Sequence, residues 1–181
     1  MLRIDIHRLR FLVIEDSAPM RHIIRTLLHG FGSRDVREAE DGGTGFGIFN
    51  EYQPDIVLTA YALRIVDGLE ITRMIRQSNE SSNPFVPIIL CANHTDKTFV
   101  TAARDAGVTE VLAKPFSAKS LYERIVYIVA NPRPFIKTKT FFGPNRRRNA
   151  GLNHAGPERR KDGKADVTQV PPLLDKTKAS V

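Results

Sequence analysis

Residues 11–16 read FLVIED, an apolar run that ends in two neighbouring carboxylates. Three more short apolar runs follow along the chain and also end in small or charged residues. Residues 56–60 read IVLTA, residues 87–93 read PIILCAN and residues 111–116 read VLAKPF. Short apolar runs of this kind are typical of strands that are buried on both faces of a sheet.

The apolar runs alternate with amphipathic stretches, a pattern typical of βαβ units that build a parallel sheet. In residues 17–29, Met20, Ile24 and Leu28 repeat at helical spacing and form part of an apolar stripe. The glycine-rich residues 42–47 lack the G-x-G-x-x-G spacing of a dinucleotide loop and follow the second expected strand, not the first, so we do not interpret them as a phosphate-binding loop. We expect strands near 11–15, 35–39, 55–60, 86–91 and 109–113, and helices near 17–29, 42–51, 68–78, 96–106 and 117–130.

Together these runs resemble the CheY-like receiver domain of two-component response regulators, over about residues 11–130. The resemblance implies an α/β fold, with a five-stranded parallel sheet and helices on both faces, the (βα)5 flavodoxin-like receiver fold. We therefore divide the chain into an N-terminal arm (1–10), a receiver domain (11–130) and a basic tail (131–181). In this family an acidic pair binds Mg²⁺, an aspartate accepts a phosphoryl group and a lysine neutralises its charge.

The resemblance assigns the acidic pair to Glu15 and Asp16 and the lysine to Lys114, but the phosphoacceptor position holds Ala60. Alanine has no oxygen that could attack phosphorus, so no covalent phosphoaspartate can form there. Without that third carboxylate, we expect no cofactor, or at most weak Mg²⁺ binding by Glu15 and Asp16. We expect Lys114 to pair with Asp16, because a buried charge needs a partner. The resemblance also implies a cis peptide bond between Lys114 and Pro115.

Three further positions depart from the family pattern. Ala92 occupies the position of the hydroxyl that bonds the phosphate, Val111 that of the switch aromatic, and Arg64 that of a proline. An engineered Asp-to-Ala change would explain Ala60 alone. Because all these positions depart from the family pattern together, we favour natural degeneration of the phosphorylation switch. We therefore predict a pseudo-receiver, which is not an enzyme.

The resemblance also implies a partner-binding face. In the family this face is formed by the fourth helix, the fifth strand and the fifth helix. Here it falls around Thr98, Arg104, Val111, Lys119 and Tyr122. We expect a protein partner to bind there, without control by phosphorylation.

Composition separates the domain from its tail. The 181 residues are 41% hydrophobic and carry a net charge of +7. Residues 131–181 hold 12 Lys and Arg against 4 Asp and Glu, so the basic charge lies in the tail. No apolar stretch approaches the roughly 20 residues of a membrane span. The single cysteine, Cys91, lies in a buried-strand pattern and forms no internal disulfide, so we expect a cytoplasmic protein.

The tail repeats the pattern G-P-x-R-R, at residues 143–147 and 156–160. Its Pro, Gly and Asn content predicts disorder, although Phe135-Ile136 and Phe141-Phe142 could instead fold back on the receiver. Some CheY-like proteins carry arginine-rich extensions that bind cyclic di-GMP, and this tail is similar in layout. Nucleic acid, an anionic membrane or no specific ligand remain alternatives. The arginines concerned are Arg146, Arg147, Arg148, Arg159 and Arg160.

Overall fold

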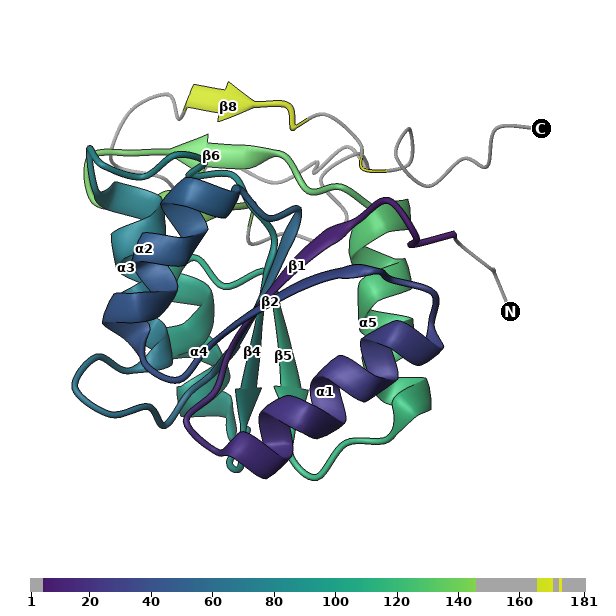
Figure 1. Ribbon diagram of the computed structural model, residues 1–181. Coiled ribbons are helices and arrows are strands. Elements are labelled where there is room, and N and C mark those ends of the chain that lie inside the picture. The colour runs from purple at the N-terminus through teal and green to yellow at the C-terminus, as the bar shows by residue number, and fades with distance from the viewer. Residues whose placement is uncertain (1–4, 146–165, 171–172, 174–181) are drawn as a thin grey trace.

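Five parallel strands form the centre of the molecule in this computed structural model, which describes residues 5–145, 166–170 and 173. The strand order is β2-β1-β3-β4-β5, and five helices cover the sheet (Figure 1). The flavodoxin-like receiver fold predicted from the sequence is confirmed. The strands are β1 (Arg10–Ile14), β2 (Asp35–Ala39), β3 (Ile56–Ala60), β4 (Ile88–Ala92) and β5 (Glu110–Ala113). The helices are α1 (Ala18–Gly30), α2 (Gly42–Tyr52), α3 (Gly68–Gln77), α4 (Lys97–Ala106) and α5 (Ala118–Ala130).

Each of the five helices begins after a short polar residue that caps it. The caps are Ser17, Asp41, Asp67, Asp96 and Ser117, and each side chain accepts a hydrogen bond from a backbone N–H of the first turn. Such bonds satisfy donors that have no partner inside the helix. The residue at which each of these helices begins is therefore marked in the sequence by its capping side chain.

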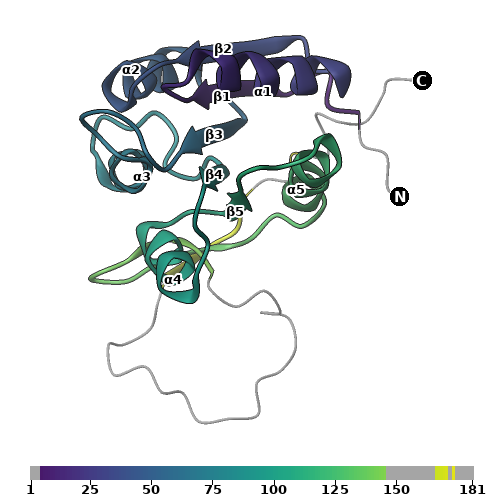
Figure 2. The same cartoon turned by 90° about the horizontal axis from the view of Figure 1, so that it is seen from below.

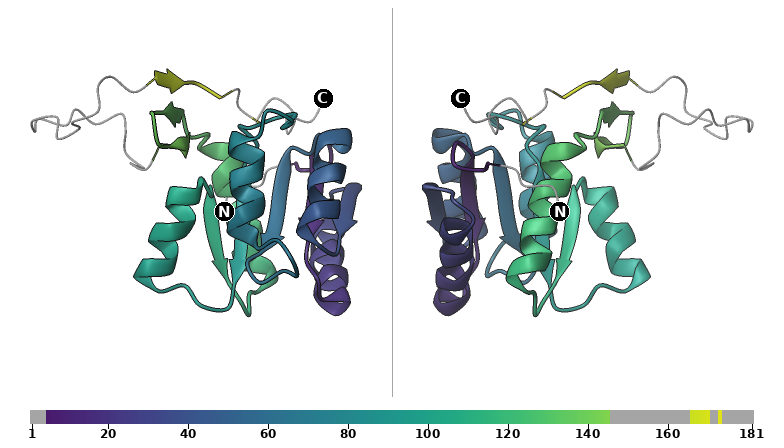
Figure 3. Two further views of the ribbon diagram at one scale, coloured as in Figure 1. Left: turned by 90° about the vertical axis from the view of Figure 1, so that its left-hand side faces the viewer. Right: turned by 90° about the vertical axis from the view of Figure 1, so that its right-hand side faces the viewer.

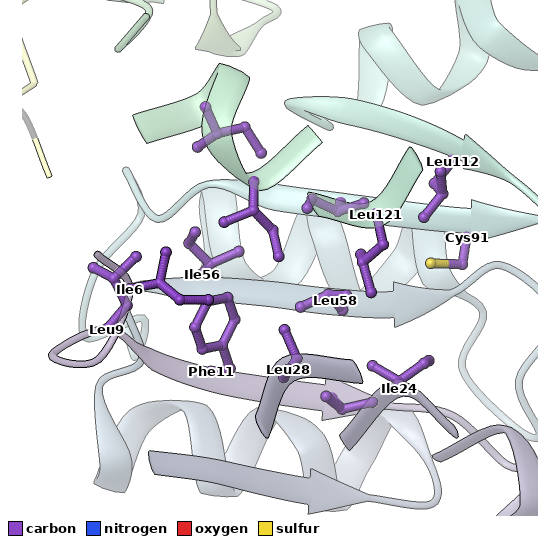
Figure 4. Close-up of a cluster of buried hydrophobic side chains, with 14 of the residues drawn as sticks. Ile6, Leu9, Phe11, Ile24, Leu28, Ile56, Leu58, Cys91, Leu112 and Leu121 are labelled. Carbon is purple, nitrogen blue, oxygen red and sulfur yellow. The ribbon is translucent and has the colours of Figure 1, made fainter. Parts of the chain in front are cut away.

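The helices form two layers, with α1 and α5 on one face of the sheet and α2, α3 and α4 on the other (Figure 2). Alternate residues of β1 supply the two cores: Phe11 and Val13 pack towards α1 and α5, whereas Leu12 and Ile14 pack towards α2 and α3. Figure 4 shows the first of these clusters. The N-terminal arm adds Ile6, which is fully buried there.

The glycine-rich segment forms the first turns of α2, as predicted, and not a loop. A Cβ atom on Gly45 would lie 2.6 Å from Cδ1 of Ile14 in β1. Glycine is therefore required at this position for close packing of the helix on the sheet.

A second sheet follows α5. It contains β6 (Phe135–Lys137), β7 (Phe142–Pro144) and β8 (Asp166–Thr168), paired antiparallel in the order β7-β6-β8. We call the described residues after Ala130 the C-terminal appendage. It lies across the amino ends of the receiver strands, opposite the carboxyl ends (Figures 1 and 3). The predicted disorder is thus wrong for these residues, and the alternative, that the tail folds back, holds for Phe135 and Phe142.

Aromatic packing explains why the appendage folds onto the receiver. The Phe85 ring, in the loop before β4, lies 5.2 Å from the Phe135 ring and 5.4 Å from the Phe142 ring. Phe135 also covers the guanidinium of Arg76, with its centroid 5.0 Å from Cζ. Arg76 is 3% exposed and donates to the carbonyl oxygens of Gly107 and Pro84. Burial lowers the pKa of Arg76 to about 9.

Candidate functional site

The residues that the sequence singles out meet at the carboxyl ends of four strands. Glu15 follows β1, Ala60 ends β3, Ala92 ends β4 and Lys114 follows β5. The register pairs Ala60 with Cys91 and Ala92 with Ala113, which brings these ends to one edge of the sheet. In open α/β sheets this edge is the usual place for a ligand.

Glu15 and Lys114 form the central ion pair at this edge of the sheet. The Lys114 ammonium donates to Oε2 of Glu15 at 2.5 Å, and Glu15 is 3% exposed. The expectation that Lys114 pairs with Asp16 is therefore wrong. Glu15 is the buried member of the acidic pair, and it has the greater need of a counter-charge. The Lys114–Pro115 peptide bond is cis, as predicted.

Asp16 faces a different cation. Its carboxylate lies 3.9 Å from Nε of Arg64, the residue that replaces the usual proline. Arg21 adds a further positive charge nearby and donates to the backbone carbonyls of Glu15 and Asp16. Arg64 was recognised in the sequence as a departure from the family pattern, but its position beside Asp16 was not predicted.

The positions between these charges are apolar. Ala60 is 3% exposed and Ala92 is 2% exposed, so both methyl groups are buried. Val111 is partly buried beside Leu90 and Phe99. Sequence reasoning missed an aromatic pair next to Ala60: Tyr61 meets Phe99 of α4 edge to face, with ring centroids 4.9 Å apart.

The donor set does not fit Mg²⁺. A magnesium site needs several oxygen ligands in octahedral geometry. Here Glu15 already accepts from Lys114, Asp16 faces Arg64, and Ala60 offers only a methyl group at the third position. Within residues 5–145, 166–170 and 173, no group of three or more His, Cys, Asp or Glu side chains is placed to hold a metal ion.

Of the five residues predicted for the partner face, only two line a common groove. Arg104 and Val111 line a groove of about 410 Å³, together with Val100 and Arg124. The buried carboxylate of Glu110 accepts from Arg124 at 3.2 Å on its wall.

The other three residues of that face lie elsewhere. Thr98 is exposed on α4, outside the groove lining. Lys119 pairs with Glu123 along α5 at 3.9 Å. Tyr122 packs edge to face on Phe31, which follows α1, with centroids 5.1 Å apart. The five tail arginines proposed to bind an anion lie outside the described residues.

Comparison with known proteins identifies the family to which this fold belongs. Residues 11–126 match the response regulator receiver domain. The chain is 26% identical over 117 residues to chemotaxis protein CheY-3 of Vibrio cholerae, covering 65% of this chain and 88% of that protein. It is equally 26% identical over 117 residues to chemotaxis protein CheY of Pseudomonas aeruginosa, covering 65% and 93% of the two chains.

Solved structures show the same fold. Chemotaxis response regulator CheY4 of Vibrio cholerae superposes with a TM-score of 0.61 at 21% identity, covering 66% of this chain and 98% of that one. The N-terminal domain of an uncharacterized protein from Wolinella succinogenes (WS1339) gives a TM-score of 0.56 at 25% identity, covering 65% and 91%.

The chain belongs to the response regulator receiver family, and its receiver domain is CheY-like. The family match ends at residue 126, so the C-terminal appendage lies beyond it. Among the described residues, none of the helices is long and apolar enough to span a bilayer.

Proposed function

We propose that this protein is a pseudo-receiver: a CheY-like signalling protein that acts by binding a protein partner, without phosphorylation of an aspartate. One observation carries the proposal. At the carboxyl edge of the sheet, a buried methyl group (Ala60) occupies the phosphoacceptor position, and both neighbouring carboxylates already face cations of the chain.

The cations do part of the work that a metal ion does in the family, because they balance the charge of the carboxylates. Lys114 and Arg64 balance the charges of Glu15 and Asp16 without any ligand. The site supplies neither a nucleophile at position 60 nor a phosphate-binding hydroxyl at position 92. A fixed receiver of this kind presents a constant surface to its partner.

The groove between α4, β5 and α5 supports a role in partner binding. Val100 is 40% exposed on its wall, beside Val111 and the cation Arg104. An apolar strip flanked by arginines fits a partner segment with an apolar residue and nearby acidic groups.

Beryllofluoride with Mg²⁺, which mimics a bound phosphoryl group, tests the loss of phosphorylation. We expect no saturable change in the amide NMR shifts of Glu15, Ala60 or Val111 in the native chain. The variant Ala60→Asp is the matched control, because it restores the missing carboxylate. It should respond at Glu15 and residue 60 while the Val111 amide stays unchanged, since the hydroxyl and the switch aromatic are still absent. Saturable shifts around Glu15 and Ala60 in the native chain contradict the proposal.

Cyclic di-GMP sensing by the tail is the second candidate, and one observation favours it. The segment 146–165, which holds all five arginines of interest, is joined at its two ends to β7 and β8, and both strands pair with β6. The arginine-rich segment is therefore tied to the receiver at both ends. Guanidinium groups bind phosphates bidentately and stack on guanine rings.

Calorimetry with cyclic di-GMP tests this candidate. Truncation at Ala130 would also uncover Phe85 and Arg76, so substitutions are the cleaner comparison. We expect Arg147→Ala combined with Arg160→Ala to weaken binding by about 100-fold, at roughly 1.4 kcal/mol per lost charge-assisted contact. The exposed Arg73→Ala serves as the control. If cyclic di-GMP gives no heat of binding, or the same heat with all three proteins, the tail is not a cyclic di-GMP sensor.

A further inference from the structure

The turn between α4 and β5, residues 107–109, joins the C-terminal appendage to the groove between α4, β5 and α5, which we call the partner groove. Val108 and Thr109 of this turn line the groove, together with Val111 of β5. Gly107, the first residue of the turn, ends α4 in the left-handed region, with a φ of 99°. The position of the turn therefore decides how α4 lies against β5, and with it the shape of the groove.

Arg76 of α3 contacts this turn and the appendage at the same time. Its Nε donates to the carbonyl oxygen of Gly107 at 3.1 Å, and its Nη1 donates to that of Pro84 at 2.8 Å. The ring of Phe135 in β6 covers the same guanidinium, with its centroid 5.0 Å from Cζ. Because Arg76 is 3% exposed and its guanidinium is planar, it cannot change one of these contacts without disturbing the others. Arg76 therefore fixes Phe135 relative to the turn.

Strand β7 packs directly on the same turn. A Cβ atom on Gly143 would lie 3.0 Å from the Cα of Gly107, and a Cβ atom on Gly107 would lie 3.3 Å from the backbone oxygen of Phe142. Arg133, which precedes β6, donates to the carbonyl oxygen of Thr109 at 3.3 Å. Two backbone segments this close have no room for independent movement, so a displacement of β7 displaces the turn as well.

We propose that the appendage sets the shape of the partner groove through the turn between α4 and β5, with Arg76 as the positioning residue. Strands β6 and β7 lie beyond the family match, so this control belongs to the appendage and not to the receiver domain alone. An event that displaces the appendage therefore changes the surface that is offered to a partner. The use of the groove by a partner rests on the proposed function, whereas the contact with the turn does not.

Gly143→Ala in the full-length ¹⁵N-labelled chain tests the control, because the added methyl group meets the Cα of Gly107 from the appendage side. We expect the amide NMR signals of Arg104 and Val111 to shift, while those of β1 and β2 keep their native positions. Gly47→Ala is the matched control: it places the same methyl group in open space on α2 and should leave Arg104 and Val111 unmoved. Shifts that are confined to β6 and β7, or spread evenly over all five receiver strands, overturn the proposal.

A second variant tests the positioning residue without adding bulk. Arg76→Lys keeps the positive charge, but an ammonium group cannot reproduce the planar fork that bonds to both Gly107 and Pro84. We expect amide hydrogen exchange at Val111 to become about tenfold faster, the equivalent of one lost hydrogen bond, while exchange in β1 stays native. Arg73→Lys, exposed on the same helix, is the control and should change neither. Unchanged exchange at Val111, or equal acceleration in every strand, overturns the role of Arg76.

Failure of this inference and failure of the proposed function are distinguishable. Unmoved groove amides in Gly143→Ala remove the control by the appendage and leave the partner groove of the proposed function in place. A saturable response of the native chain to beryllofluoride with Mg²⁺ removes the pseudo-receiver assignment. That response would leave the contacts of Arg76 and Gly143 with the turn unaffected.

Discussion

The two ends of the receiver sheet are held together by different forces. At the carboxyl end, Glu15 pairs with Lys114 and Asp16 faces Arg64. At the amino end, Phe85 and Phe135 pack together and the buried Arg76 is held by backbone carbonyls and an aromatic ring. One end is a charge network, and the other is an aromatic contact added by the appendage.

This difference shows where the chain can respond to its surroundings. A buried ion pair loses several kcal/mol when one partner goes, because the remaining charge stays desolvated. Aromatic and apolar contacts weaken gradually as area is lost. We therefore expect the carboxyl end to behave as a fixed structural element, and the amino end to be the more adjustable of the two.

The largest expected effect comes from breaking the buried ion pair. Lys114→Met leaves the Glu15 carboxylate, 3% exposed, without its cation. We expect a loss of about 4 kcal/mol in the free energy of unfolding, measured by urea denaturation. Lys119→Met is the control: that side chain is 75% exposed in its pair with Glu123, so its removal should change stability by less than about 0.5 kcal/mol.

A double variant separates charge from packing at the same position. Glu15→Gln combined with Lys114→Met removes both charges, and it should recover at least half of the loss. A double variant that is as unstable as Lys114→Met alone would show that the lysine stem, and not the ion pair, stabilises this end.

The next largest effect is expected at the amino end. Phe135→Ala removes a ring that is 4% exposed and contacts Phe85, Phe142 and Arg76. We expect a loss of about 3 kcal/mol if the appendage and the receiver unfold as one unit. Val167→Ala, exposed on β8, should be nearly neutral. An unchanged unfolding midpoint, with amide exchange accelerated only in β6 and β7, would show that the appendage unfolds separately.

Much of the fold could be predicted from the sequence because local signals agreed with it. Strands and helices of the receiver begin and end within two residues of the predicted positions, since apolar runs and capping residues mark them. Ser117 is an example: it stands at the start of the last predicted helix, and its hydroxyl accepts from the N–H of Ser120. These interactions are short-range, so the sequence shows both partners together.

The failures involve partners that lie far apart in the chain. Glu15 and Asp16 are equivalent in sequence, and only the folded packing shows that Glu15 points inward to Lys114, 99 residues away. The appendage was expected to be disordered because its composition is polar and rich in Pro and Gly. Its few aromatic residues fold because Phe85 and Arg76 offer a complementary surface, which no local pattern indicates.

A smaller effect tests how closely the appendage approaches the receiver. A Cβ atom on Gly143 would lie 3.0 Å from the Cα of Gly107 and 2.9 Å from the Phe141 ring. Gly143→Ala should therefore cost about 1–2 kcal/mol in thermal or urea unfolding, because two backbone segments must separate. Gly47→Ala is the matched control in the receiver. It has open space around it in α2 and should stabilise the chain by about 0.5–1 kcal/mol. A neutral Gly143→Ala would mean that the contact between the appendage and Gly107 is loose.

The smallest expected effect concerns the exposed pair at the carboxyl end. Arg64 is 82% exposed and lies 3.9 Å from Asp16, so Arg64→Ala should change the free energy of unfolding by less than about 0.5 kcal/mol. It should, however, release Asp16 from a competing cation and raise the affinity for Mg²⁺ by about threefold, as followed by the Asp16 amide in an NMR titration. The exposed Arg73→Ala, on α3, should leave both quantities unchanged. If Arg64→Ala leaves Mg²⁺ binding unaltered, the missing carboxylate at Ala60, and not the added arginine, is what excludes the metal, and Arg64 has no part in fixing the pocket.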